Sequence, residues 1–254
     1  MKYILFDTET TGNTELDRII QVGAMIIDSE KYSQNTNYSE NLFDNIVENK
    51  VIVYDELCKS DVKISLEAME VHNITPEMIE NKPSFKELGF YKALSENNNS
   101  SNYLIAHNIK FDLEMLQKEG FVNEYKLIDT LKCAKVIFPD LAYHRLQYLR
   151  YALGLYKIEQ KAANELGISI KAHDAIGDVL VMKLLLDELA KYKTYEEMHK
   201  ITKEPLISTK FPFGKYKGMS FAEIKEIDYK YLNWAVNNID DQDLVYSIKK
   251  FLES

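Results

Sequence analysis

The sequence predicts a mixed α/β domain followed by a small separate module. Strand-like apolar segments dominate the first part of the chain, and strands then alternate with helical patterns, which is typical of a mixed sheet covered by helices. The character of the sequence changes at residue 207, where Lys, Phe, Tyr and Gly become frequent. We therefore expect an α/β domain over 1–193, a linker over 194–206 and a C-terminal module over 207–254.

The first strands are expected close to the N-terminus. Residues 2–7 form a short apolar run that ends in an acid, and the following TETTGN is typical of a loop. Residues 18–28 are rich in Ile and Val, which predicts the second strand. The polar stretch 29–41 predicts a connection or an exposed hairpin, and further β-type segments are expected at 41–47 and 51–54.

The later elements are predicted mostly from helix start and stop residues. Thr75 and Pro76 predict a helix start, Asn108 and Asp129 are typical N-caps, and Gly120 marks a helix end. The further expected elements are helices over 83–94, 109–119, 130–137, 145–153 and 174–191, strands over 103–106 and 127–128, and C-terminal helices over 221–226, 229–237 and 241–252.

The composition is that of a folded, water-soluble protein. Apolar residues make up 46% and charged residues 28% of the 254 residues. No window approaches the roughly 18 consecutive apolar residues of a membrane helix, and the N-terminus does not resemble a signal peptide. Cys58 and Cys133 are the two cysteines and match neither a disulfide framework nor a zinc site. A cytoplasmic protein without membrane contact is expected.

The net charge of −9 does not exclude a nucleic-acid partner. An acidic site that binds divalent cations becomes electropositive once they are bound. The charge is also uneven, because residues 206–254 contain seven lysines and seven acids, so that the preceding 205 residues carry the whole negative charge. Three arginines in the chain argue against sequence-specific base recognition, which depends largely on Arg.

Two carboxylates at the end of the first strand are candidate metal ligands. Asp7 and Glu9 are two residues apart, and alternate residues of a strand point to the same side. Two acids placed in this way repel each other unless a cation lies between them. The alternative is a strand end with solvated acids.

Two later segments add acids at helix starts. In AHNIKFD, Asp112 lies in the expected first helical turn, where favourable interaction with the helix dipole is the alternative explanation. In HDAIGD, Asp178 lies five residues beyond His173. Five helical residues turn by about 140°, so these two side chains converge only if His173 belongs to the preceding loop. A solvated cap histidine is the alternative for His173.

Together, FDTETTG, AHNIKFD and HDAIGD resemble the three motifs of the DEDD exonuclease superfamily, histidine subclass, which includes polymerase proofreading subunits and ribonuclease T. The resemblance covers about residues 1–190. It implies an RNase H-like fold, a mixed five-stranded sheet with helices on both sides. It also implies that Asp7, Glu9, Asp112 and Asp178 form the metal site and that His173 is the general base.

The chemistry of these residues fits that role. Four carboxylates without a cysteine select hard cations, so two Mg²⁺ or Mn²⁺ ions are expected. Two such ions can activate a water and stabilise the leaving 3′ oxygen of an in-line displacement. On this interpretation Asp7 bridges the ions, Glu9 and Asp178 complete one of them, and Asp112 acts at the second. His173 takes the proton from the water near neutral pH.

The resemblance also implies substrate contacts. Thr10 matches a position whose backbone meets the terminal sugar, and residues 71–75, which include His72, resemble the segment that closes over the 3′ nucleotide. Phe111 resembles the residue that flanks the terminal base or sugar, with core packing as an equal alternative. His107 is expected in the same pocket, with a structural histidine bonded to the backbone as the alternative.

The C-terminal segments KFPFGKYKG (210–218) and YLNW (231–234) resemble the C-terminal module of the exonuclease X group. Lysines alternate with aromatics in the first segment, and such a pattern could hold a nucleic-acid strand by phosphate contact and stacking. The alternative is a hairpin whose aromatics pack on Trp234. We expect the aromatics to pack in this way and the lysines to contact DNA.

These features together predict a metal-dependent 3′→5′ exodeoxyribonuclease that releases 5′-mononucleotides and serves DNA repair. Its partners would be DNA 3′ ends, with single strands favoured. Attack on duplex ends stays open, because residues 13–15 are polar where an apolar wedge could open the duplex, although Leu16 could substitute. An exoribonuclease that trims RNA 3′ ends is the alternative. A non-catalytic nucleic-acid-binding or polymerase-associated module is disfavoured, since no metal ligand of the motifs is missing.

Overall fold

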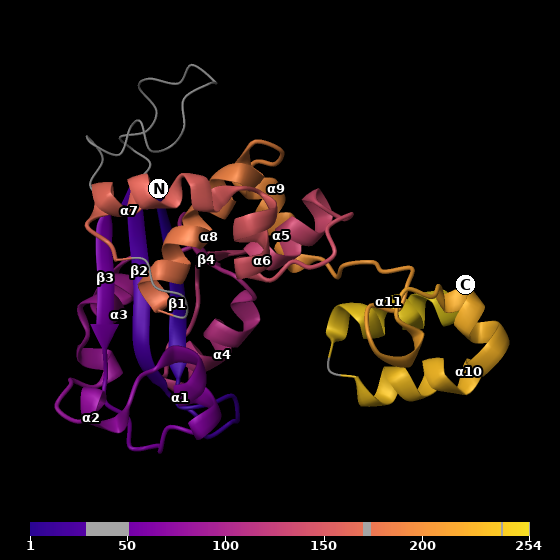
Figure 1. Ribbon diagram of the computed structural model, residues 1–254, viewed down its shortest axis with the longest axis horizontal. Helices are drawn as coiled ribbons and strands as arrows, with labels where there is room; N and C mark the ends of the chain where they lie inside the picture. The colour runs from indigo at the N-terminus through magenta and orange to yellow at the C-terminus, as the bar shows by residue number, and fades with distance from the viewer. Residues whose placement is uncertain (29–50, 170–173, 240, 254) are drawn as a thin grey trace. The chain divides into compact units, whose positions relative to one another are not determined.

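A computed structural model describes residues 1–28, 51–169, 174–239 and 241–253 (Figure 1). The expected hairpin at 29–41 and strand at 41–47 lie outside these ranges. The chain divides into two compact units, Met1–His199 and Lys200–Ser254, each with its own core.

The first unit is built on a five-stranded sheet with the order β3-β2-β1-β4-β5. β1 pairs antiparallel with β2, and β2 with β3, whereas β1 pairs parallel with β4, and β4 with β5. The strands are β1 (Lys2–Thr10), β2 (Ile19–Asp28), β3 (Ile52–Leu57), β4 (Tyr103–Ala106) and β5 (Lys126–Asp129). The prediction of a mixed five-stranded sheet is therefore confirmed.

β1 is longer than the sequence predicts. The segment expected as a loop from Thr8 onward continues in the strand to Thr10. Thr8 pairs with Val22 and Glu9 with Gln21 on β2, and the register shifts only between Glu9 and Thr10. Thr8 and Thr10 are favourable strand residues, and pairing with β2 outweighs the lower strand propensity of Glu9.

One face of the sheet is covered by α8 (Ala175–Ala190), which packs on β1 and β2 (Figure 1). Nearly all sides of this helix are buried, because three further helices pack against it. These are α5 (Thr130–Ile137), α6 (Leu146–Ala152) and α7 (Glu159–Leu166). The one lysine buried along α8, Lys183, forms an ion pair with Asp187 one turn later.

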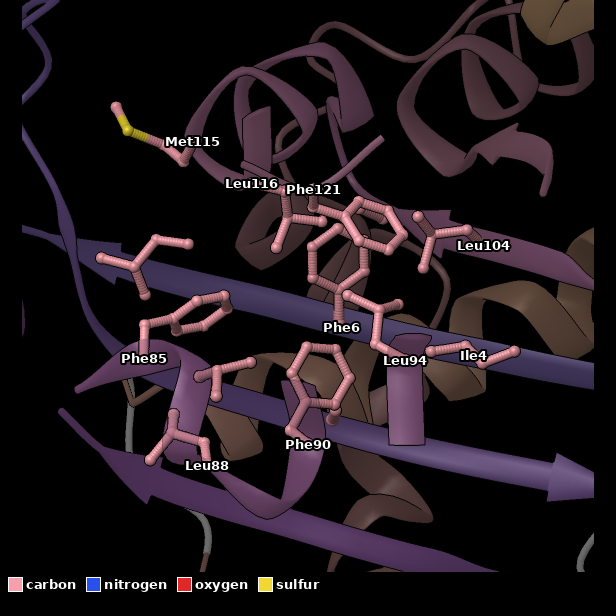
Figure 2. Packing of buried hydrophobic residues seen from close by; sticks show 14 of the residues in the cluster. Ile4, Phe6, Phe85, Leu88, Phe90, Leu94, Leu104, Met115, Leu116 and Phe121 are labelled. Atoms are coloured by element: carbon pink, nitrogen blue, oxygen red, sulfur yellow. The ribbon is translucent and has the colours of Figure 1, made fainter. Parts of the chain in front are cut away.

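The other face is covered by α3 (Gly89–Glu96) and α4 (Ile109–Lys118). Figure 2 shows Phe6 of β1, Phe90 of α3 and Leu116 of α4 in one apolar cluster. Neighbouring residues of β1 point to opposite faces, so Phe6 supports this layer while Asp7 points toward the α8 side. The strand thus carries core residues on one face and acids on the other.

The remaining elements of this unit are short. The segment 83–94, expected as one helix, is a 3-10 turn, η3 (Phe85–Glu87), followed by α3, because Leu88 between them is extended. The pattern did not predict α1 (Leu66–His72) or α7. The other short elements are α2 (Pro76–Ile79) and the 3-10 turn η4 (Leu155–Lys157).

The expected linker 194–206 contains a helix, α9 (Tyr195–Lys203), and the boundary between the two units falls inside it. Tyr195 stacks on Tyr3 with ring centroids 4.4 Å apart, and Met198 is fully buried. The first half of the segment therefore belongs to the first unit.

The C-terminal unit consists of a loop with the 3-10 turn η5 (Gly214–Tyr216) and two helices, α10 (Phe221–Asn238) and α11 (Gln242–Glu253). A β-bridge between Lys210 and Ser220 closes the loop. α10 is kinked at Asp228, which matches the break predicted between 226 and 229. Phe211, Phe221 and Leu232 are central to its core.

Both cysteines are fully buried in the first unit, and neither forms a disulfide. Cys58 follows β3, and burial raises the pKa of its thiol to about 12. Cys133 lies on α5. In the part of the chain that the structure describes, no helix has the length and apolarity to cross a membrane.

Candidate active site

Asp7 and Glu9 point to the same side of β1, as predicted. Both are partly exposed, whereas Thr8 between them is buried. The antiparallel pairing with β2 holds the three residues in extended conformation. Two carboxylates are thus presented next to each other at the surface of the sheet.

Asp112 lies in the first turn of α4 and is buried. The chain turns from β4 into α4 at Asn108, which has a left-handed backbone (φ 72°). The Asn108 N–H donates to Asp129 Oδ1 at 3.0 Å, and this bond secures the turn. The Thr8 hydroxyl donates to Asp112 Oδ1 at 2.8 Å and so fixes Asp112 beside the first strand.

Asp178 lies in the first turn of α8 and accepts a hydrogen bond from Gln147 Nε2 at 2.6 Å. Gln147 Oε1 in turn accepts from Arg150 at 3.1 Å, and this sets the orientation of the amide. Arg150 is held in an ion pair with Glu159, with 2.6 Å between Nε and Oε2. Residues of α6 and α7 therefore position the carboxylate of α8.

The first turn of α8 can reach the acids of β1 because β2 has a glycine at this point. Gly23 pairs directly with Asp7. A Cβ atom at Gly23 would lie 2.3 Å from backbone atoms of both Ala175 and Ile176. The backbone of α8 therefore lies directly on that of β2, and Asp178 follows within the same helical turn.

Burial opposes the ionisation of Asp7, Glu9 and Asp112, and the charges of neighbouring acids add to this effect at Asp7 and Glu9. Burial, with the charges of Asp112, Glu9 and Asp178, raises the pKa of Asp7 well above its usual range. Burial, followed by the charge of Asp178, raises the pKa of Glu9 to about 8. Burial raises the pKa of Asp112 to about 7, although the hydrogen bond from Thr8 lowers it. The four predicted metal-site acids thus lie within electrostatic reach of one another.

The donor set of this cluster suits a hard divalent cation. All four side chains offer only carboxylate oxygens, and a bound cation would remove the mutual repulsion. Among the residues that the structure describes, no three His, Cys, Asp or Glu side chains are already arranged as metal ligands. Asp112 and Asp178 each accept a hydrogen bond from a protein donor, which fixes the orientation of the carboxylates that a cation would bind.

The substrate-binding candidates Thr10 and His72 are bonded to each other. His72 Nδ1 accepts the N–H of Ile74 at 2.9 Å, so Nε2 carries the proton and donates to the Thr10 carbonyl at 3.2 Å. Burial lowers the pKa of His72, which favours this neutral ring. His72 therefore anchors the end of α1 to the end of β1.

His107 and Phe111 have mixed surroundings. Both ring nitrogens of His107 are engaged, Nε2 by the His144 carbonyl and Nδ1 by the Thr130 hydroxyl, each at 2.9 Å. Burial lowers the pKa of His107 to about 4. These contacts favour the structural alternative for His107. Phe111 is partly exposed and packs in part on the apolar cluster of α3 and α4, so both of its alternatives stay open.

His173 lies outside the described residues, and its role stays a prediction. The next residue, Asp174, is the N-cap of α8 and accepts a hydrogen bond from Gln21 Nε2 at 3.1 Å. Its charge adds to those that raise the pKa of Glu9.

Comparison with known families identifies the family to which this fold belongs. A family model described as exonuclease matches residues 4–186, and a model described as exodeoxyribonuclease X-like C-terminal matches residues 211–240. The chain belongs to the exonuclease family. This family depends on divalent metal ions. The resemblance to the exonuclease motifs and to the exonuclease X C-terminal module is confirmed.

Individual relatives agree with this exonuclease assignment. Exodeoxyribonuclease 10 of Escherichia coli K12 is 28% identical over 236 residues, which cover 90% of this chain and 98% of the relative. The DNA polymerase III subunit epsilon of Treponema pallidum is 31% identical over 60% of this chain and 65% of its own. A structure of exonuclease X in complex with 5′ overhanging duplex DNA shares the fold, with a TM-score of 0.53 and 21% identity over 79% of this chain and 99% of that one.

The sequence motifs do not include the residues that support the four acids. Gln147 and Arg150 lie on the predicted helix 145–153, and their partners Asp178 and Glu159 lie on later helices. Thr8 falls in a segment that is typical of a loop. Gly23 offered a usable signal, because a glycine inside an Ile- and Val-rich strand often marks a close backbone approach.

Proposed function

We propose that the protein is a metal-dependent 3′→5′ exodeoxyribonuclease that hydrolyses DNA from the 3′ end and releases 5′-mononucleotides. The observation that carries the proposal is the cluster of Asp7, Glu9, Asp112 and Asp178, in which the charges of Asp112 and Asp178 raise the pKa of both Asp7 and Glu9. The family membership and the relatives that act on DNA support the same activity. A role in DNA repair follows as part of this proposal.

These four acids would hold two Mg²⁺ or Mn²⁺ ions. The bound ions would neutralise the charge that develops on the scissile phosphate and lower the pKa of a nearby water. The ions are hard cations, and their preference for oxygen ligands fits this all-carboxylate set.

The chain itself would orient the ligands and the substrate. Thr8 and Gln147 keep Asp112 and Asp178 in fixed orientations through the hydrogen bonds at 2.8 and 2.6 Å. The backbone at Thr10, anchored by His72, would meet the terminal sugar. Phe111 would flank the terminal base, and His173 would accept the proton of the attacking water.

Digestion of matched single strands tests the proposal. We expect 5′-labelled DNA to shorten from its 3′ end in Mg²⁺ or Mn²⁺, with no cleavage in EDTA and little cleavage of RNA of the same sequence. Asp7→Asn should reduce the rate at least about a hundredfold, the scale of losing one electrostatic stabiliser. Asp140→Asn removes an exposed acid outside the cluster and should leave the rate unchanged.

Two results would contradict the proposal in different ways. A faster RNA ladder would replace DNA by RNA 3′ ends as the substrate. Wild-type cleavage by Asp7→Asn would show that this cluster is not the site of hydrolysis.

A further inference from the structure

The single tryptophan of the chain is a half-exposed aromatic side chain in the C-terminal unit. Trp234 lies on α10 and is 50% exposed. Its ring lies against Tyr231 at 5.3 Å between centroids and an interplanar angle of 31°. The expected packing of this unit's aromatics onto Trp234 is therefore only partial, since one side of the indole is left to solvent.

Trp234 is connected to the buried aromatic residues of the unit through Tyr231. Tyr231 contacts Phe211 and Tyr216, with ring centroids 5.3 and 4.8 Å away. Phe211 and Tyr216 are buried, and the Tyr216 hydroxyl donates to Asp228 at 2.7 Å. The position of Trp234 is thus set by the core of the unit.

The neighbouring loop presents a second exposed ring. Phe213 is 43% exposed and makes an edge contact with Phe211 at 5.7 Å. The loop turns at Gly214, which has a left-handed backbone (φ 67°). A Cβ atom at this position would lie 3.8 Å from the Tyr231 hydroxyl, so the turn lies close to Tyr231. Phe213 and Trp234 therefore belong to one aromatic cluster.

The two segments that carry the exposed rings are rich in lysine, although the chain as a whole carries −9 and one of these lysines, Lys215, lies 3.5 Å from the carboxylate of Asp228. Residues 209–219 and 229–239, which hold Phe213 and Trp234, contain four lysines and no acid. On α10 the exposed residues three or four positions from Trp234 are Lys230, Asn237 and Asn238. A helix that docks on a protein would place apolar residues at these i ± 3 and i ± 4 positions.

We propose that Trp234 and Phe213, with Lys215 and Lys230, form a binding site for single-stranded nucleic acid. Bases stack on the exposed rings and the lysines contact phosphates, a combination that tolerates any sequence because every base has a flat face. The site goes beyond the proposed exonuclease function, since binding here needs neither metal nor cleavage. It should lower the KM for long strands and leave kcat unchanged.

Intrinsic fluorescence tests the site directly, because Trp234 is the only tryptophan. The full-length protein in EDTA is titrated with a dT oligonucleotide and an rU oligonucleotide of about 16 nucleotides, the upper end of site sizes for one nucleic-acid-binding domain. We expect saturable quenching of Trp234 by at least one of them. Comparison of the dissociation constants from the two titrations shows whether DNA or RNA is preferred.

Variants separate stacking from charge. By anisotropy of labelled oligonucleotide, Trp234→Ala should bind roughly tenfold more weakly, and Trp234→Phe should retain most of the affinity. Lys215→Ala with Lys230→Ala should reduce the slope of log K against log salt by about 0.7 for each phosphate that the variant no longer neutralises. Tyr246→Ala and Lys249→Ala, exposed positions on α11, are matched controls and should change nothing.

Three results would overturn the proposal. The first is the absence of quenching by either oligonucleotide, and the second is equal quenching by heparin, which has charge but no bases. The third is quenching that depends on protein concentration in the absence of nucleic acid, which would indicate self-association. The outcome is independent of the proposed function. A protein that degrades a short oligonucleotide but shows no quenching refutes this site alone, whereas quenching without metal-dependent cleavage refutes the exonuclease proposal alone.

Discussion

At the scale of single residues, the acids of the cluster are held in positions that disfavour their charged forms. The pKa of Glu9 is raised to about 8 and that of Asp112 to about 7, mainly by burial. An unfolded chain releases these protons at about pH 4. Between about pH 4 and pH 8, the folded, metal-free protein therefore binds more protons than the unfolded chain.

This difference predicts how stability depends on pH. Because the folded pKa values of Glu9 and Asp112 are raised, these two groups contribute stability that is fully present below about pH 4. This contribution is lost as the pH rises through 7 to 8. In EDTA, the urea midpoint should fall over this range. Saturating Mg²⁺ or Mn²⁺ should remove the fall, and Asp7→Asn should reduce it. A flat profile in EDTA would contradict the raised pKa values of Glu9 and Asp112.

The hydrogen bond from Gln147 to Asp178 leads to a second prediction. Gln147→Ala leaves Asp178 without the donor that fixes its orientation, and the loss of such a partner weakens metal binding by about 10- to 100-fold. Titration with Mn²⁺ measures the dissociation constant without DNA. Gln160→Ala, an exposed glutamine on α7, is the control. Equal Mn²⁺ affinity in both variants would show that Gln147 does not position a ligand.

At the scale of elements, the contact between β2 and α8 determines where the acids meet. Gly23→Ala places a methyl group 2.3 Å from the backbone of α8, so the start of the helix has to shift. Overpacking of this kind costs about 1–3 kcal/mol of stability. We expect urea unfolding of Gly23→Ala to show this loss of stability. We also expect its cleavage rate to fall by more than the decrease in the fraction of folded protein accounts for.

Gly89→Ala provides the comparison, because its new methyl group would mainly meet the carboxylate of Glu56 at 3.1 Å and the ring of Tyr54. A side chain can move where a helix backbone cannot. If Gly23→Ala were as active as Gly89→Ala, the close approach would not be what brings Asp178 to the site.

The sequence predicted elements well where local signals agree with tertiary contacts. Asp129 caps α5 as expected, and its carboxylate accepts the N–H groups of Leu131 and Lys132. The prediction was wrong for Thr8, whose conformation is decided by pairing with β2. It also missed α7, which packs on α8 with only a few small buried residues.

At the scale of the whole molecule, each compact unit has its own apolar core. The cluster around Phe6 and Phe90 lies entirely in the first unit, and the cluster around Phe211 and Leu232 lies entirely in the second. The motifs predicted an α/β domain followed by a small module, and a site of four acids that stays a prediction. They could not predict the hydrogen bond that orients Asp178, because its donor, Gln147, belongs to no motif.

Two cores predict two unfolding steps. A metal ion bound by the acids stabilises only the first unit, by about 2.7 kcal/mol at 100 times the dissociation constant. We expect Mn²⁺ to raise one transition in calorimetry and to leave unchanged the transition followed by Trp234 fluorescence, which reports the second unit. A single transition that shifts as a whole would mean that the two units unfold together.

The burial of both cysteines makes the folded protein inert toward thiol reagents. Neither Cys58 nor Cys133 is exposed, and a pKa of about 12 keeps the Cys58 thiol protonated. Any modification of the native chain therefore reports a transient opening of the first unit. A cysteine introduced on the surface would be the one thiol that reacts in the folded state, so a fluorophore or spin label could be attached there without removing the native pair.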